Sequence, residues 1–192
     1  MKEDLRVQKT KAALVRAFYE LLAEKSYESI TINELCERAE VRRATFYKHY
    51  RDKQDFLIAL AARFRENFRS IIKSEGKSLT LAECFSKYVS STVDHITSKP
   101  ELVKNIIKSQ MREPFINVVL QSGFKAAAER INEARALGTP ISISTDVAAS
   151  MIIGGTSMLL IEWFENGMQI PRERLEADIA ITIKRILASE KV

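Results

Sequence analysis

The first part of this chain lacks the residues that usually end helices. No glycine occurs before Gly76, and no proline occurs before Pro100. Glycine and proline are the strongest local breaks in regular structure, so the first 75 residues are predicted to form closely connected helices. An alternating strand pattern with hairpin turns is missing from the sequence, since residues 141–144 alternate over too few positions to form a strand. The predicted fold class is therefore all-α.

Polar and helix-breaking residues also mark the predicted organisation of the chain. The segment 74–78, Ser-Glu-Gly-Lys-Ser, separates two helical regions and predicts a domain boundary. A chain of 192 residues suits one small domain and one larger domain. We expect domains at 1–54 and 76–192, with a helix over 52–73 as the connector. The other helices are expected near 5–25, 32–39, 43–50, 79–98, 101–110, 114–137, 146–166 and 171–189.

Residues 41–53 carry the most informative side chains. Five of these thirteen residues are Lys or Arg and one is Asp, against a net charge of +5 for the whole protein. Aromatic and hydroxyl residues stand between the basic ones, whereas a purely solvated charged segment has no use for interleaved aromatics. Cations neutralise phosphates, hydroxyls donate to them, and aromatic rings can hold a short helix on its own domain. This pattern predicts a helix that binds a polyanion.

A capping sequence comes before the basic segment. Thr31 and Glu34 have the spacing of a capping box, in which each side chain bonds the backbone N–H of the other residue. The box would open a short helix, and residues 40–42 would connect that helix tightly to the basic one. A helix, a turn and a basic helix form the outline of a helix-turn-helix, whose second helix lies in the DNA major groove. The apolar side of the first of these helices is expected to comprise Ile32, Leu35, Cys36 and Ala39.

Residues 9–57 resemble the DNA-binding domain of the tetracycline-repressor (TetR) family. The match is densest at 45–50, Thr-Phe-Tyr-Lys-His-Tyr, and continues with Asp52 and Lys53 at the start of the next helix. The resemblance implies an N-terminal three-helix DNA-binding domain and a C-terminal helical bundle with a two-helix dimerisation face. It also implies a transcriptional regulator, most often a repressor. The other matching residues are Ala17, Phe18, Leu21, Thr31, Ile32, Leu35, Ala39, Val41 and Leu57.

Two positions depart from the pattern of that family. The family often has Gly in the turn, where this chain has Glu40, and a left-handed backbone there would cost a non-Gly residue about 1 kcal/mol. Relatives often open the recognition helix with Ser or Asn, where this chain has Arg42. An arginine side chain cannot cap a helix N-terminus, but it can reach a phosphate or a guanine edge. The operator sequence therefore cannot be transferred from a relative.

The DNA-facing side chains are predicted from the clustering of charge and from the resemblance. Arg42 and Arg43 are the candidates for reading bases, because arginine pairs bidentately with guanine. Lys53 is expected to meet a phosphate, because a cation in the first turn of a helix is unfavourable without an anion. Phe46 and Tyr50 are four residues apart and are expected inside the domain. The predicted DNA-binding residues are Thr31, Arg42, Arg43, Thr45, Tyr47, Lys48, His49 and Lys53, with a solvated surface role as the alternative for each.

The second domain is expected to hold an effector pocket and a dimer interface. The candidates for the pocket lining are aromatic and methionine side chains: Phe85, Tyr88, Met111, Phe115, Phe124 and Trp163. In the relatives that the chain resembles, the last two helices pair with their copies, which would place two recognition helices about 34 Å apart on a palindromic site. The interface implied here comprises Met151, Ile152, Gly155, Leu159, Leu175, Ile179, Ile183 and Ile186. Packing in the core of a single subunit is the alternative for both sets.

Other classes of function have little support in the sequence. Cys36 and Cys84 are far apart and lack a histidine at ligand spacing, so neither a zinc site nor a disulfide is expected. The sequence has no nucleophile elbow, phosphate loop or metal-binding His-Glu motif, so we expect no enzymatic activity, no metal and no cofactor. The longest apolar runs span only a few residues and no apolar leader follows Met1, so we expect no membrane partner and a cytoplasmic location.

These observations together predict a ligand-responsive, homodimeric transcriptional regulator, acting as a repressor on a palindromic operator. Its expected partners are double-stranded DNA, a second copy of the chain and a small-molecule effector of unknown identity. The alternative is a helical co-regulator or adaptor that keeps the same fold and acts mainly through a protein partner. Glu40 and Arg42 leave that alternative open, because they depart from the DNA-binding pattern.

Overall fold

The computed structural model describes residues 5–60, 79–110 and 112–188. These residues form helices, turns and connecting loops, and no strand occurs among them, so the predicted all-α class is confirmed. They divide into two compact units. The first unit contains residues 5–60 together with 99–110 and 112–116, and the second contains residues 79–98 and 117–188.

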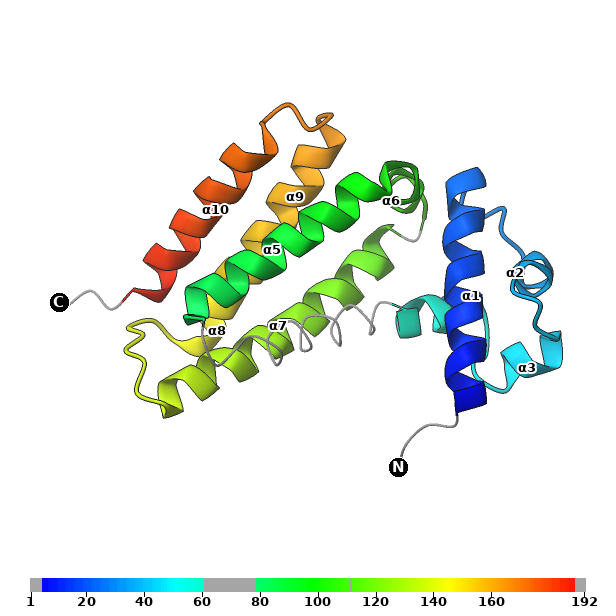
Figure 1. The fold of residues 1–192 in the computed structure, drawn as a ribbon, viewed down its shortest axis with the longest axis horizontal. Helices are drawn as coiled ribbons and strands as arrows, with labels where there is room; N and C mark the ends of the chain where they lie inside the picture. Colours follow the sequence, from blue (N-terminus) through cyan, green and yellow to red (C-terminus); the bar gives the residue numbers. More distant parts are fainter. Residues whose placement is uncertain (1–4, 61–78, 111, 189–192) are drawn as a thin grey trace. The chain divides into compact units, whose positions relative to one another are not determined.

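The first unit contains the helix-turn-helix (Figure 1). Two short helices, α2 and α3, follow the long helix α1, and a further helix begins at residue 53 and is described to residue 60. The predicted basic helix over 43–50 is shorter than expected, since residues 48 and 49 form a turn. The helix α6, distant in sequence, packs against α1. The helices are α1 (Leu5–Glu24), α2 (Ile32–Arg38), α3 (Arg43–Tyr47) and α6 (Pro100–Ile107).

The core of the first unit joins segments that are far apart in the sequence. Leu14, Phe18 and Leu21 lie one helical turn apart on a single face of α1, and each of them is buried. Leu102 and Ile106 of α6 pack into the same apolar core. The predicted domain 76–192 contains α6, whereas this core places α6 with the N-terminal helices. The rest of the predicted connector, residues 61–73, lies outside the described residues.

The second unit is built around α5 and α10, which pack along each other (Figure 1). Helix α5 begins with a capping box that was not predicted: the Glu83 N–H donates to Thr80 Oγ1 at 3.3 Å, and the Thr80 N–H donates to the Glu83 carboxylate at 2.7 Å. Side chains from α7 and from the helical stretch 145–165 complete the apolar core. The helices are α5 (Leu81–Ser98), α7 (Arg112–Ala136), α8 (Thr145–Ala149), η1 (Ser150–Gly155), α9 (Thr156–Glu165) and α10 (Arg172–Leu187).

Local chemistry defines both ends of the helical stretch 145–165. The Ser144 hydroxyl accepts from the Val147 N–H at 3.4 Å and caps the start, so the helix begins one residue before the range expected near 146–166. Gly167 adopts a φ of 73° in the left-handed region and ends the helix.

One turn of this stretch, η1, is a π-helix. It lies close to α7, where a Cβ atom on Gly123 would be only 2.8 Å from Cγ2 of Ile153. The missing side chain of Gly123 therefore lets the backbone of α7 approach Ile153, which is 5 % exposed. Single π turns inside α-helices insert one extra residue and shift the register of the following turns.

The stretch Thr145–Glu165 is more apolar than the short apolar runs of the sequence indicated. Its 21 residues are long and apolar enough, by length and composition, to cross a membrane. A third of its most apolar window is buried inside the protein, and core helices pass the same test. Small residues such as Gly154 and Ser157 separate the apolar runs without lowering the mean hydropathy of the helix much.

We predict that Gly123→Ala destabilises the protein by about 1–3 kcal/mol, because the added methyl group must displace a buried isoleucine. Thermal and urea unfolding followed by circular dichroism would measure the effect. Gly154→Ala is the matched control, since a Cβ atom there would meet the Phe124 ring at an ordinary 3.7 Å. The control should leave stability unchanged or raise it by up to about 1 kcal/mol, and equal losses in both variants would contradict the contact.

Candidate DNA-binding surface

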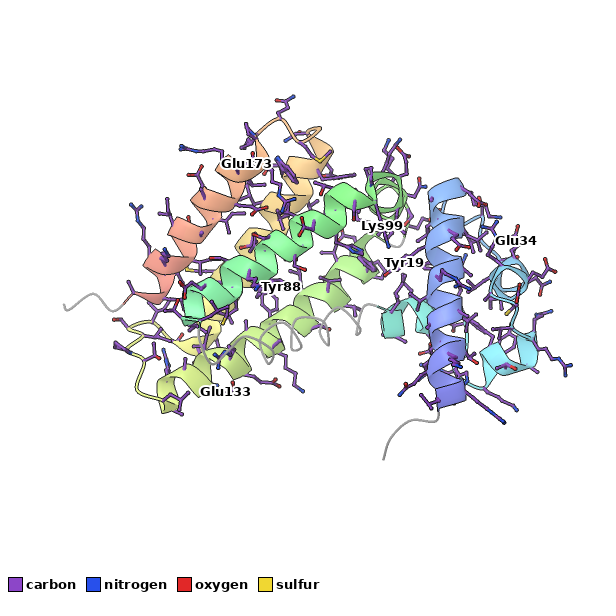
Figure 2. The ribbon with its side chains drawn as sticks, in the orientation of Figure 1. Tyr19, Glu34, Tyr88, Lys99, Glu133 and Glu173 are labelled. Atoms are coloured by element: carbon purple, nitrogen blue, oxygen red, sulfur yellow. The ribbon has the colours of Figure 1, made fainter. Side chains whose placement is uncertain are left out.

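The predicted capping box at the start of α2 is confirmed. The Glu34 N–H donates to Thr31 Oγ1 at 3.2 Å, and the Thr31 N–H donates to the Glu34 carboxylate at 2.9 Å. Glu34, labelled in Figure 2, also accepts from the Lys25 ammonium at 2.5 Å. Hydrogen bonds from Lys25 and from Thr31 lower the pKa of Glu34 to about 2. The start of α2 is therefore held by a carboxylate that stays ionised at neutral pH.

The turn between α2 and α3 has the strained backbone that the sequence predicted. Glu40 adopts a φ of 56°, in the left-handed region, and its side chain is exposed. The Val41 N–H donates to the Cys36 carbonyl at 2.9 Å, which closes the end of α2. This backbone costs a non-Gly residue about 1 kcal/mol, so the surrounding contacts hold the turn against its local preference.

Phe46 of α3 and Tyr50, just beyond its end, point inward, whereas the cations of this segment point outward. Phe46 is 0 % exposed and Tyr50 is 7 % exposed, whereas Tyr47 is 47 % exposed, as predicted. The guanidinium carbon of Arg43 lies 5.8 Å from the centroid of the Tyr47 ring, within the range of a cation–π contact. Among the described residues, the Arg42 side chain makes no capping hydrogen bond at the start of α3, which leaves it available for another partner. Among the predicted DNA-binding residues of this segment, the exposed ones are Arg42, Arg43, Tyr47 and Lys48, and the half-buried ones are Thr45 and His49.

Five aromatic rings hold α3 in place. The Phe56 ring packs against the rings of Phe46 and Tyr50, with centroid distances of 6.0 and 5.0 Å. It also packs edge to face against Phe18 of α1 at 5.2 Å, and Phe18 in turn contacts Tyr27 at 6.2 Å. Pairs of this kind contribute about 0.5–1.5 kcal/mol each beyond the area that they bury. The cluster therefore fixes the recognition helix to α1 and to the helix over 53–60.

Lys53 has a different environment from the predicted one. Its ammonium donates to the carbonyl oxygens of Tyr27 and Ile30, each at 2.7 Å, and lies 3.5 Å from the Glu28 carbonyl oxygen. It also lies 4.1 Å from the centroid of the Tyr27 ring. Burial lowers the pKa of Lys53, against the charges of Glu28 and Glu34, which raise it. Lys53 was expected to meet a phosphate, whereas the structure gives its ammonium backbone carbonyls as partners.

Arg51 belongs to the same cationic segment but was not among the predicted DNA-binding residues. Its side chain is 88 % exposed, and one guanidinium nitrogen lies 3.7 Å from an Asp55 carboxylate oxygen. Exposed pairs of this kind contribute little to stability. The concentration of positive charge in residues 41–53 was the sequence signal that could have added Arg51 to the predicted DNA-binding residues.

Five of the six predicted effector-binding residues are described, and they belong to the cores of both units. Phe85 and Trp163 are buried in the core of the second unit, and the Trp163 indole N–H donates to the Ile170 carbonyl at 2.8 Å. Phe115 packs instead against the core of the first unit. The two other described members, Tyr88 and Phe124, are half-buried against the core of the second unit, and Met111 lies outside the described residues.

Four of the predicted dimer residues are core residues of their own subunit. Ile152, Leu175, Ile179 and Ile183 are each at most 4 % exposed. Side chains with so little free surface pack in the core of their own unit and have little area left for contact with a second copy. Their helical spacing is the same for an inner and an outer face, which is why the sequence pattern could not separate the two.

The outer face of the same helices carries the other predicted residues. Met151 is 54 % exposed and Leu159 is 37 % exposed, while Gly155 is exposed and Ile186 is half-buried. Three further large apolar side chains that were not predicted are also exposed on α8, α9 and α10: Val147, Met158 and Ile181.

Two stretches of the chain match known family descriptions. Residues 14–60 match "Bacterial regulatory proteins, tetR family", and residues 83–185 match "Transcriptional regulator C-terminal region". The helix-turn-helix, with its exposed cations, and the helical second unit define a DNA-binding transcriptional regulator. The chain belongs to the TetR family of bacterial regulatory proteins.

Individual relatives agree with this assignment. The HTH-type transcriptional regulator YxbF of Bacillus subtilis is 44 % identical over 61 residues, which cover 31 % of this chain but only 16 % of that protein. The crystal structure of a TetR-family regulator from Syntrophomonas wolfei has a TM-score of 0.74 and 17 % identity, over 96 % of this chain and 98 % of that one. FadR of Bacillus subtilis, in complex with stearoyl-CoA, has a TM-score of 0.66 and 17 % identity, over 92 % and 97 % of the two chains. The two structures show that the fold is shared.

We predict that Glu40→Gly stabilises the protein by about 1 kcal/mol, because glycine adopts the left-handed backbone without steric cost. The free energy of unfolding in urea would measure the gain. Glu40→Gln removes the same charge and keeps the strained backbone, so it should stay within about 0.5 kcal/mol of the parent. A gain as large in the Gln variant would mean that charge repulsion, and not the backbone, destabilises this turn.

Proposed function

We propose that the protein is a ligand-responsive, homodimeric transcriptional repressor that binds a palindromic operator. The observation that carries the proposal is the outer side of α3, where Arg42, Arg43, Tyr47 and Lys48 are exposed above the buried Phe46 and Tyr50. Cations on a short, rigidly held helix suit the major groove, in which arginine reads guanine and lysine neutralises a phosphate. Thr45 and His49 flank these residues, and Thr31 is exposed at the start of α2.

The dimer that we propose uses the outer face of α8, η1, α9 and α10. Large apolar side chains on a surface commonly mark a protein–protein interface, and this face exposes Val147, Met151, Met158, Leu159 and Ile181. A two-fold axis through the face would present two recognition helices to half-sites about 34 Å apart, one turn of DNA.

The effector site that we propose lies in the second unit. Tyr88, which is labelled in Figure 2, and Phe124 are half-buried against the core, beside the buried Phe85 and Trp163. Burial raises the pKa of Tyr88, against a hydrogen bond with Thr92 that lowers it. An effector that binds one arrangement of the helices more tightly would shift the spacing of the two recognition helices and weaken operator binding. The cytoplasm, where operator DNA is present, is the location that we propose.

We predict that Arg43→Ala weakens operator binding by about 1–3 kcal/mol and relaxes the preference at one or two base pairs. Selection from random double-stranded oligonucleotides by the parent would yield the operator, and repeating it with the variant would measure the preference. Arg16→Ala on α1 is the matched control, since it removes the same charge from a side chain that is 75 % exposed and lies outside α3. An unchanged preference in the Arg43 variant would contradict base reading. A parent without affinity for any duplex at low ionic strength would exclude DNA binding and favour the co-regulator.

We predict that Met158→Glu converts the dimer into a monomer, because an unpaired carboxylate in an apolar interface costs about 3 kcal/mol or more. Sedimentation velocity over a range of concentrations would measure the shift. Leu137→Glu is the matched control, because Leu137 is 83 % exposed and lies beyond the end of α7, outside the proposed face. A parent that sediments as a monomer at micromolar concentration, or a dimeric Met158 variant, would contradict this interface.

A further inference from the structure

The turn between α1 and α2, residues 25–31, is tied to the start of the helix over 53–60. The Lys53 ammonium has three protons, and three backbone carbonyls of this turn, at residues 27, 28 and 30, lie 2.7–3.5 Å from it. The ring of Tyr27 covers the ammonium, and Tyr27 is buried to 7 % exposure. A side chain committed in this way has little capacity left to bind a DNA phosphate.

The same turn is also tied to residues 99–110, which are distant in sequence. The Gln110 N–H donates to a carboxylate oxygen of Glu28 at 2.7 Å. One turn earlier, the Asn105 amide donates at 2.5 Å to the Leu22 carbonyl, one of the carbonyls left free at the end of α1. Burial alone would raise the pKa of Glu28, but hydrogen bonds from the backbone amides of Glu28 and Gln110 hold it below its ordinary value.

A further contact fastens the start of α6 to α1. The Lys99 ammonium lies 4.7 Å from the centroid of the Tyr19 ring, and Figure 2 shows the two side chains between these helices. The turn 25–31 is therefore held from α6 and its C-terminal extension on one side and from Lys53 on the other. The two ties meet at Glu28, whose backbone carbonyl lies 3.5 Å from the Lys53 ammonium and whose carboxylate accepts from the Gln110 N–H.

These contacts lead to the recognition helix. Lys53 begins the helix that carries Phe56, and Phe56 packs against Phe46 of α3 and Phe18 of α1. Resting on the function proposed above, we propose that Lys53 and Glu28 are positioning residues for DNA binding: they hold the turn 25–31 and thereby seat α3, and neither of them contacts DNA.

The first test separates positioning from phosphate contact by the salt dependence of binding. Lys53→Met keeps the length of the side chain and removes the ammonium, and Lys48→Met makes the same change on the exposed side of α3. Operator affinity would be measured by fluorescence anisotropy over a range of salt concentrations, at a temperature at which circular dichroism shows each variant folded. Loss of a phosphate contact lowers the slope of log K against log[salt] by about 1 per subunit. We expect that loss for the Lys48 variant, whereas the Lys53 variant should keep the parent slope and bind about 2- to 30-fold more weakly at every salt concentration.

The second test uses a substitution for which electrostatics predicts tighter operator binding and positioning predicts weaker operator binding. Glu28→Ala removes a negative charge, which by itself should strengthen binding to a polyanion. Because it also releases the tie to Gln110, we expect weaker operator binding with an unchanged salt slope. Glu101→Ala removes the same charge from α6, where that carboxylate pairs with Lys104 and not with the turn, so it should not weaken binding. The double variant at positions 28 and 53 should lose less than the product of the single losses, because both changes release the same turn.

Three results would overturn the inference. One is a Lys53 variant whose salt slope falls as far as that of the Lys48 variant, which would mean a phosphate contact. Another is a folded Lys53 variant that binds as tightly as the parent. The third is a Glu28 variant that binds as tightly as the parent or more tightly. A parent that binds no duplex would overturn the proposed function and this inference together, and so is distinguishable from these three.

Discussion

The aromatic cluster around Phe56 is the interaction on which the DNA-binding surface depends. Helix α3 has five residues, and isolated helices of that length are unstable in water. It is held because Phe46 and Tyr50 pack against Phe56, which also contacts Phe18 of α1. Each of these rings is at most 7 % exposed, so the cluster is part of the core and leaves the opposite side of α3 free for charged residues.

This arrangement explains how the chain tolerates two unfavourable residues next to α3. Glu40 adopts a left-handed backbone without the help of glycine, and Arg42 occupies the cap position without capping. Each costs about 1 kcal/mol, and the buried aromatic pairs offset losses of that size. At Arg42 this tolerance serves the proposed function, because a guanidinium that does not cap the helix can reach into the DNA major groove.

Local chemistry was predictable from the sequence, and contacts between distant segments were not. The capping box of Thr31 and Glu34, the inward Phe46 and Tyr50 and the left-handed Glu40 depend on residues within four positions of each other. The carbonyl partners of Lys53 lie more than twenty positions away, and the contact of Gly123 with Ile153 spans thirty. Helical spacing also could not decide which apolar face of α9 and α10 points inward. The sequence pattern identified both helices as apolar, and only their packing assigned Ile179 and Ile183 to the core.

Lys48 and Lys53 show why the number of cationic residues in a segment can exceed the number that contact DNA. Both belong to the cationic segment 41–53, and on charge alone they are equivalent. The ammonium of Lys53 is held by carbonyls of the α1–α2 turn, whereas Lys48 stands on the exposed end of α3. Glu28 of the same turn accepts a hydrogen bond from the Gln110 N–H. A division of the sequence at residue 76 would assign Gln110 to the other domain. The proposed DNA-binding surface is therefore shaped by residues on both sides of that boundary, and a fragment that ends near residue 60 would lack part of what holds α3 in place.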